Sequence, residues 1–171
     1  MTELDGLTVR ALGTRDERPF LALRSALIAD GLTLAKDYRA GMLWDDYLIV
    51  QHNASAGVGL PPEMVPYTFL MAEVNGVFVG SSDIRHTLSD ELMRWGGHVG
   101  YVVAPQHRRR GYATEILRQT LVKAKDLGIG SARLTCRQEN IGSRRVIETW
   151  GGQLAAVTAD GICQYWIDLD N

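Results

Sequence analysis

The stretch YVVAPQHRRRGYATEIL, from Tyr101 to Leu117, decides how the rest of the chain is interpreted. We predict a strand over 98–103, which Pro105 ends because proline lacks the N–H that a sheet ladder requires. Three consecutive arginines follow. From Gly111 onward, the apolar residues recur with the period of an amphipathic helix. The sequence therefore predicts a strand, a tight basic turn and a helix in immediate succession.

This turn is suited to binding an anion such as a phosphate. The first N–H groups of a helix lack intrahelical partners and lie at the positive end of the helix dipole. Gly111 permits a tight turn and close approach of a ligand, and Ala113 keeps the next position small. Arg108, Arg109 and Arg110 add charged donors there. Taken alone, the pattern also fits a solvated basic loop before an ordinary helix.

The regions on either side mix helical and strand patterns, which predicts an α+β (mixed α/β) fold with helices on a largely antiparallel sheet of about seven strands. Before the stretch we predict a strand over 7–12, a helix capped by Thr14 with Glu17 at capping-box spacing, a helix from Lys36 to Gln51, a loop over 53–66, and strands over 67–74 and 77–84 around the turn Asn75-Gly76. After it we predict a helix closed by Gly128, a strand over 132–137, a helix over 140–150, and strands over 153–157 and 162–169.

Composition limits the class of protein. The chain has 171 residues, 46% hydrophobic and 22% charged, which is typical of one globular domain over 1–171. A net charge of −2 provides no general attraction for nucleic acid or anionic membranes. We find no secretion signal and no apolar run of about 18 residues. The two cysteines match no metal-ligand spacing and are too few for a disulfide framework, so we expect a cytoplasmic protein without metal.

Several motifs at matching separations resemble the GNAT acetyltransferase superfamily. The resemblance is strong from His98 to Gly152, covers about Tyr67 to the C-terminus, and fits the first 66 residues in outline. It rests on IRHTL, GGHVGYVVAP, RRRGYAT, Arg108-x-x-Gly111-x-Ala113 against the signature [QR]-x-x-G-x-[GA], Val103-Ala104-Pro105, and Asn140-x-x-Ser143 with Glu148 and Gly151-Gly152. It is similar to a broad bacterial group of predicted acetyltransferases.

The resemblance implies that the fourth and fifth strands splay apart and that the pantetheine of acetyl-CoA lies between them. It assigns the backbone of Val103 to the pantetheine, and a backbone N–H near Val102 or Val103 to the thioester carbonyl oxygen. It assigns Asn140 to a further cofactor contact, with Ser143 nearby, although Asn140 also fits a simple helix cap. The pyrophosphate falls to Arg108 and to the backbone of Arg109, Arg110, Gly111, Tyr112, Ala113 and Thr114.

The activity implied is transfer of the acetyl group of acetyl-CoA to a primary amine by direct attack. The first alternative is a GNAT-fold sensor or regulator that binds acyl-CoA without turnover. An enzyme acting on charged tRNA is disfavoured by the near-neutral charge. The acceptor stays open among small amines, amino acids, aminoglycoside-like molecules and peptide or protein amines. Homodimers are common in the family, so the resemblance implies that this chain can form a homodimer.

Catalytic groups are less well specified. For the base we favour His98, because an unperturbed imidazole titrates near ~6.5, followed by His86 and Asp83; each histidine also fits a structural role. Many members of the family carry a tyrosine that can act as the general acid seven residues after the capping asparagine, where this chain has Ile147. The acid therefore stays unassigned, with Tyr101 and Tyr112 the nearest tyrosines in sequence.

Two further interpretations complete the sequence analysis. Cys136 is expected to be a buried packing residue rather than a nucleophile. Substrate selection is expected from the region 14–66. There an acidic and aromatic group could form an entrance for a cationic amine, or could be ordinary core and surface residues: Trp44, Asp45, Asp46, Tyr47 and Glu63.

Overall fold

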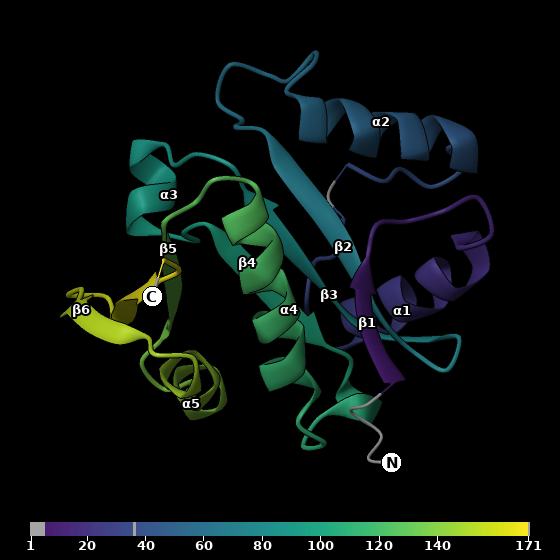
Figure 1. Ribbon diagram of the computed structural model, residues 1–171. Coiled ribbons are helices and arrows are strands. Elements are labelled where there is room, and N and C mark those ends of the chain that lie inside the picture. The colour runs from purple at the N-terminus through teal and green to yellow at the C-terminus, as the bar shows by residue number, and fades with distance from the viewer. Residues whose placement is uncertain (1–5, 36, 171) are drawn as a thin grey trace.

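The computed structural model describes residues 6–35 and 37–170. Within these residues, five α-helices surround seven strands, the number that the sequence predicts (Figure 1). The helices are α1 (Glu17–Ala29), α2 (Trp44–Ala56), α3 (Asp90–Arg94), α4 (Tyr112–Asp126) and α5 (Ile141–Thr149). The strands are β1 (Leu7–Arg10), β2 (Tyr67–Val74), β3 (Val77–Arg85), β4 (Val99–Val103), β5 (Ser131–Arg137), β6 (Gln153–Val157) and β7 (Ile162–Asp168).

The strands form two antiparallel sheets rather than the single sheet expected. One has the order β1-β2-β3-β4 and the other the order β5-β7-β6. Gly97 and Leu134 form an isolated bridge between them, and the N–H of His98 donates to the carbonyl of Arg133 at 2.7 Å. Beyond this contact β4 and β5 are edge strands of different sheets. The expected separation of the fourth and fifth strands is therefore present.

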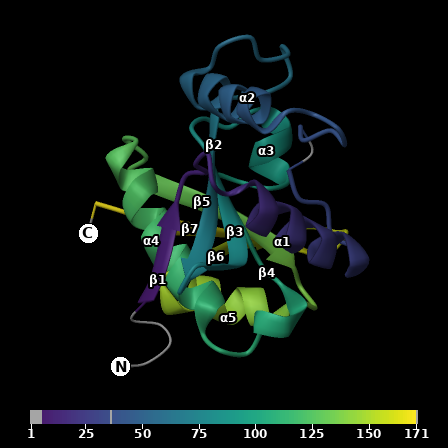
Figure 2. The ribbon, with the colours of Figure 1, turned by 90° about the vertical axis from the view of Figure 1, so that its right-hand side faces the viewer.

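Helices cover both faces of the first sheet. Figure 2 shows α4 on one side of this sheet and α1 on the other. The α4 side forms a core with residues such as Ile116 and Leu117, which continues to β5, β7 and α5. The opposite side forms a second core in which neighbouring rings among Phe20, Tyr38, Trp44 and Tyr47 lie 5.1–5.5 Å apart between centroids.

The start of the first helix differs from the prediction. The helix begins at Glu17 after Asp16, and Thr14 lies in the preceding turn rather than at the cap. The reason is a tight turn in which the N–H of Asp16 donates to the carbonyl of Gly13 at 3.1 Å, while the Asp16 carboxylate accepts from the Gly13 N–H at 2.7 Å. These bonds occupy the residues that a cap at Thr14 would require.

The second helix lies further along the chain than predicted. It begins at Trp44, not Lys36, which is outside the described residues, and it continues past Gln51 to Ala56. Turns separate α1 from α2, and Gly57 ends α2 in a left-handed conformation with φ of 71°. The predicted loop over 53–66 is consequently shorter at its start.

The remaining elements follow the prediction closely. Val74 pairs with Val77 around Asn75-Gly76, whose φ values of 50° and 80° are those of a tight hairpin turn. The polar excursion before β4 contains the short helix α3, which the sequence analysis missed and which Ser89 caps. The other helices and strands begin and end within a few residues of their predicted bounds.

Candidate functional site

The edge of β4 that faces β5 carries backbone groups not used by the first sheet. The N–H of Ala104 donates to the carbonyl of Val79 on β3 at 2.9 Å. In an antiparallel ladder the direction of the backbone groups alternates, so those of Val102 also face β3. Those of Tyr101 and Val103 face the open edge. The register therefore favours Val103, and adds Tyr101, as the donors to a ligand lying along this edge.

A short 3-10 helix (Pro105–His107) and a turn connect the end of β4 to the N-terminus of α4. Gly111 is the N-cap residue with φ of 82°, and no side chain of the described residues caps this helix. The N–H groups of Thr114 and Glu115 both donate to the carbonyl of Gly111, at 3.1 and 3.3 Å. Arg109 also adopts a positive φ of 64°, and both it and Gly111 are exposed. An exposed, uncapped helix start with a glycine is a favourable anion site.

The Arg108 side chain is partly committed within the protein. Its Nε donates to the carbonyl of Val103 at 3.0 Å, and its terminal nitrogen pairs with the Asp30 carboxylate at 2.5 Å. The guanidinium therefore connects the turn to the end of β4 and to the C-terminal end of α1. Because 42% of the side chain is exposed, the guanidinium can still contact a bound anion.

The start of α5 lies opposite Tyr101. Asn140 caps α5 by accepting the N–H of Ser143 at 3.0 Å, as the cap interpretation predicts. The hydroxyls of Tyr101 and Ser143 lie 2.8 Å apart. Burial raises the pKa of Tyr101 to about 12 and that of Cys136, on neighbouring β5, to about 11. The structure thus brings Tyr101, Asn140 and Ser143 together and confirms Cys136 as a buried thiol.

His98 lies at the junction of the two sheets. Its Nδ1 accepts the backbone N–H of Arg133 at 2.9 Å, and its ring faces Trp166 at 6.4 Å between centroids. Burial, together with the positive charges of Arg133 and Arg85, lowers the pKa of His98. The imidazole is therefore held neutral with one nitrogen occupied in a structural bond.

His86 lies at the far end of β3, against α2. Its Nε2 is 2.8 Å from the Thr68 hydroxyl, which in turn is 3.0 Å from the Ser55 hydroxyl. Burial lowers the pKa of His86. These partners belong to α2 and β2, so the structure does not join His86 to the open edge of β4.

Asp83 lies beside the centre of β4. It pairs in register with Gly100, and a Cβ on Gly100 would come within 2.7 Å of the Asp83 carboxylate. The glycine therefore leaves the space that this carboxylate fills. Burial raises the pKa of Asp83, and the ion pair with Arg85 at 2.7 Å opposes that shift. Among the three sequence candidates, Asp83 has the position most suitable for a base next to the β4 edge.

The sequence analysis missed a polar cluster on the same face of the sheet. The Tyr67 hydroxyl donates to the Asp37 carboxylate at 2.6 Å, and the Gln51 amide donates to the same carboxylate oxygen. Within 6–35 and 37–170, the buried side-chain polar atoms without a hydrogen-bond partner are Nε of Arg24, the hydroxyl of Tyr47 and Oε1 of Gln51. The only sequence signal was the mixture of tyrosine and acid over 37–67.

The five residues of the expected acidic and aromatic entrance lie in two different environments. Asp45, Asp46 and Glu63 are exposed to solvent, as ordinary surface charges are. Trp44 is 7% exposed and donates its indole N–H to the carbonyl of Gly13 at 3.0 Å, so it is a core residue. Tyr47 is fully buried in the second core.

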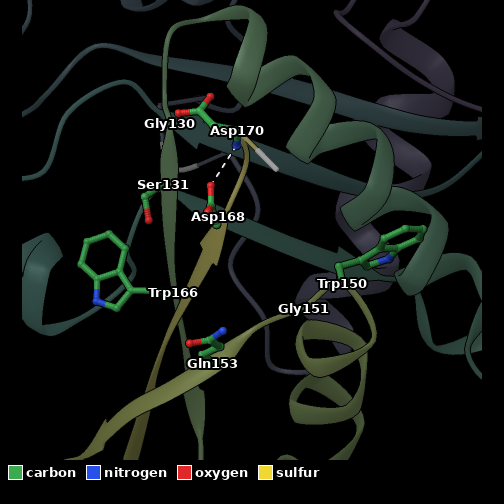
Figure 3. A pocket seen from close by; sticks show the side chains of 8 residues that line it. All are labelled: Gly130, Ser131, Trp150, Gly151, Gln153, Trp166, Asp168 and Asp170. Atoms are coloured by element: carbon green, nitrogen blue, oxygen red, sulfur yellow. Dashed lines mark hydrogen bonds between the residues drawn. The ribbon is translucent and has the colours of Figure 1, made fainter.

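A cavity of about 790 Å³ opens elsewhere, on the second sheet. Figure 3 shows Trp166 and Trp150 on opposite sides of it, with Asp168 and Asp170 between them. The residues predicted for cofactor binding or catalysis do not line this cavity. Its other lining residues are Gly130, Ser131, Gly151 and Gln153.

Two kinds of feature are absent from the described part of the chain. None of its helices is both long enough and apolar enough to cross a membrane. Its histidine, cysteine and acidic side chains do not gather in groups of three or more suited to a metal ion.

Comparison with known proteins gives the family. The Acetyltransferase (GNAT) domain family matches residues 44–153, which is more than half of the chain. The protein belongs to the GNAT acetyltransferase family. No curated protein sequence matches the chain.

Solved structures share the fold at low sequence identity. Among them are yncA of Salmonella typhimurium with its cofactor acetyl-CoA (19% identity, TM-score 0.66, covering 97% of this chain and 95% of that one) and RimJ of Mycobacterium smegmatis with CoA-disulfide (20%, 0.68, 96% and 82%). A third is the spermidine N-acetyltransferase of Vibrio cholerae with CoA and spermine (15%, 0.64, 97% and 97%). These likenesses confirm the mixed α+β fold.

Proposed function

We propose that residues 1–171 form one domain that transfers the acetyl group of acetyl-CoA to a primary amine by direct attack. One observation carries this proposal: the open edge of β4 is followed by a turn whose Arg108 bonds back to Val103 and which ends at the exposed, uncapped N-terminus of α4. An extended pantetheine amide can pair with a free strand edge, and a pyrophosphate suits a helix start. Family membership supports the same reaction.

The cofactor contacts follow from this arrangement. The N–H of Val103 and the backbone groups of Tyr101 bind along the β4 edge, whereas the register leaves Val102 to contribute through its side chain. The turn from Arg108 to Thr114 holds the pyrophosphate with backbone N–H groups and with its arginines. Asn140 and Ser143 border the site from the start of α5. The chemistry requires no metal.

Catalysis requires a base and a hydrogen-bond donor to the thioester carbonyl oxygen. An ammonium must lose a proton before it attacks, and Asp83 lies on the face of β4 opposite α4, beside Gly100. Because burial raises its pKa, this carboxylate is a stronger base than an exposed one. The N–H of Tyr101 or Val103 stabilises the carbonyl oxygen as it gains charge. His98 and His86 stay second candidates.

The acceptor approaches from the side of α1 and α2. The cluster of Asp37, Tyr67 and Gln51 occupies that side, and the negative charge of Asp83 acts on Tyr67. Carboxylates and a phenol suit a small-molecule amine or a peptide or protein amine. We propose that the chain forms a homodimer. We propose neither nucleic acid nor a membrane as a partner. A cytoplasmic location is part of the proposal, and Cys136 and Cys163, which lie opposite each other in the register of β5 and β7, are both buried.

A sensor that binds acyl-CoA without turnover is the second candidate. It is favoured by Ile147, which is 1% exposed and packs in the core where many relatives have an acidic tyrosine. Such a protein would bind acetyl-CoA but would not release its thiol in the presence of any amine.

Calorimetric titration with acetyl-CoA tests the proposal, with adenosine diphosphate and a longer acyl-CoA as controls. Binding that prefers acetyl-CoA is the expected result. Thiol release is then measured with spermine, L-lysine, glycinamide and a peptide with a free N-terminus. Binding with turnover supports the enzyme, and binding without turnover of any amine supports the sensor. Failure to bind any CoA species would remove both.

A further inference from the structure

The leaving thiolate needs a group that stabilises its charge, and the position used by many relatives cannot supply one. Ile147 is aliphatic and 1% exposed. A Cβ on Gly152 would come within 2.4 Å of its side chain, so the turn after α5 closes tightly over it. This buried aliphatic side chain therefore offers no hydroxyl at this position. The group must come from another element.

Tyr101 occupies the gap between β4, β5 and α5. Its backbone faces the open edge of β4. A thioester carbonyl bound at this edge brings its sulfur to the same place, because the sulfur is bonded directly to the carbonyl carbon. The side chain points to the α4 and α5 face, where it packs against the core. Its hydroxyl reaches Ser143 in the first turn of α5, 2.8 Å from Oγ and 3.3 Å from the carbonyl oxygen.

We propose that the phenol of Tyr101 donates a hydrogen bond to the departing sulfur and is the catalytic residue that stabilises the thiolate. This inference rests on the proposed function. As the amine forms the C–N bond, the C–S bond breaks and its electron pair stays on sulfur. The amine proton leaves to the base, and the thiolate takes its proton from water after departure. The Tyr101 hydroxyl exchanges its Ser143 partner for the sulfur.

The ionisation of Tyr101 distinguishes hydrogen bonding from complete proton transfer. Burial raises its pKa to about 12, whereas an ordinary thiol titrates near ~8.5. Transfer of the phenol proton to the thiolate would therefore be uphill, and the phenol stays a protonated donor. Of the ionisable groups on the adjoining elements, Cys136 of β5 acts on the ionisation of Tyr101, and Arg144 and Glu148 of α5 act in turn on Cys136. They are the same in the variants below.

The test compares Tyr101→Phe with Tyr165→Phe. Tyr165 is a matched control because its buried hydroxyl also bonds to α5, donating to Glu148 at 2.8 Å and accepting from Arg144 at 3.2 Å. The measurement is the pKa of the thiol of bound CoA, followed by the ultraviolet absorbance of the thiolate with S-methyl-CoA as the blank. A hydrogen bond to an anion lowers that pKa by about one to two units.

The expected result is a thiol pKa that rises by about one to two units in Tyr101→Phe and is unchanged in Tyr165→Phe. With whichever of the four probe amines is turned over, kcat falls about ten- to a hundredfold and the KM for acetyl-CoA changes little. An equal thiol pKa in wild type and Tyr101→Phe would overturn the inference and leave the proposed function intact. Failure of wild type to bind CoA would overturn both.

Discussion

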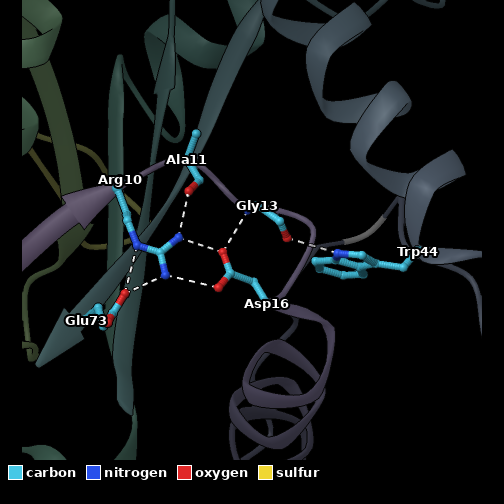
Figure 4. Close-up of polar contacts among 6 residues, drawn as sticks. All are labelled: Arg10, Ala11, Gly13, Asp16, Trp44 and Glu73. Atoms are coloured by element: carbon cyan, nitrogen blue, oxygen red, sulfur yellow. Dashed lines mark hydrogen bonds and ion pairs between the residues drawn. The ribbon is translucent and has the colours of Figure 1, made fainter. Parts of the chain in front are cut away.

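Arg10 and Asp16 form a two-point ion pair, with one nitrogen–oxygen distance of 2.5 Å and the other of 3.0 Å (Figure 4). Arg10 ends β1 and also binds Glu73 of β2, while Asp16 precedes α1 and accepts the Gly13 N–H. The pair therefore fixes where α1 leaves the first sheet. The hydrogen bonds from Arg10 hold the pKa of Asp16 below its usual range, against the effect of burial.

Asp16→Asn is expected to destabilise the protein by about 1–3 kcal/mol at neutral pH, because it weakens buried bonds to a charged group. The wild-type contribution is fully present above the unfolded pKa of about 3.9 and is lost as pH falls through the lower folded pKa. Urea unfolding at several pH values measures this. The difference between variant and wild type should shrink on acidification.

The control for that experiment is Glu115→Gln. Glu115 pairs with Arg118 on the surface of α4, so its loss should cost at most about 1 kcal/mol. A difference for Asp16→Asn that is independent of pH would show that the ion pair with Arg10 is not its source.

Gly111→Val should abolish acetyl-CoA binding while the fold survives. A β-branched side chain is strained at φ of 82° and would stand where the ligand approaches the backbone. Gly161→Val is the matched control, since Gly161 has φ of 79° in the turn between β6 and β7 with open space around it. Both variants should lose similar thermal stability. Equal acetyl-CoA affinity in the two, measured by calorimetry, would place the phosphate site elsewhere.

Asp30→Asn should preserve or tighten acetyl-CoA binding, whereas Arg108→Ala should weaken it about tenfold. Asp30 holds the Arg108 guanidinium in an ion pair, and neutralising Asp30 releases that charge for an anion. One charged hydrogen bond of about 1.4 kcal/mol corresponds to the tenfold change. Calorimetry at low and high salt measures both. Weaker binding in Asp30→Asn would mean that the ion pair itself positions the site.

Asp83→Asn should lower kcat about a hundredfold or more, because a positioned base contributes on that order. In wild type, kcat should fall as pH drops through the Asp83 pKa, which burial raises, since the carboxylate must be ionised to accept a proton. His98→Ala should keep the same pH profile. A flattened profile in His98→Ala, with an unaltered one in Asp83→Asn, would exchange their roles.

Local patterns predicted much of this protein. Asn75-Gly76 specifies its hairpin because few other residue pairs accept two positive φ values. Gly128 follows α4 in the same way, with φ of 85°. The predicted start of the second helix, at Lys36, was wrong. Aromatic and apolar residues over 38–50 pack into the core both from the turn and from the helix. Periodicity alone could not separate the two.

The sequence by itself determined the strand, the turn and the helix from Val99 to Asp126. Proline, glycine and the helical period of apolar residues set the backbone conformation of their own segment, without contacts from distant parts of the chain. Only the tertiary structure decided which side chains meet. It committed His98 to the sheet junction, paired Arg108 with Asp30, and placed the Tyr101 hydroxyl on Ser143, 42 residues away in the chain. Such contacts depend on the register of β4 and on the packing of α5, which no local pattern encodes.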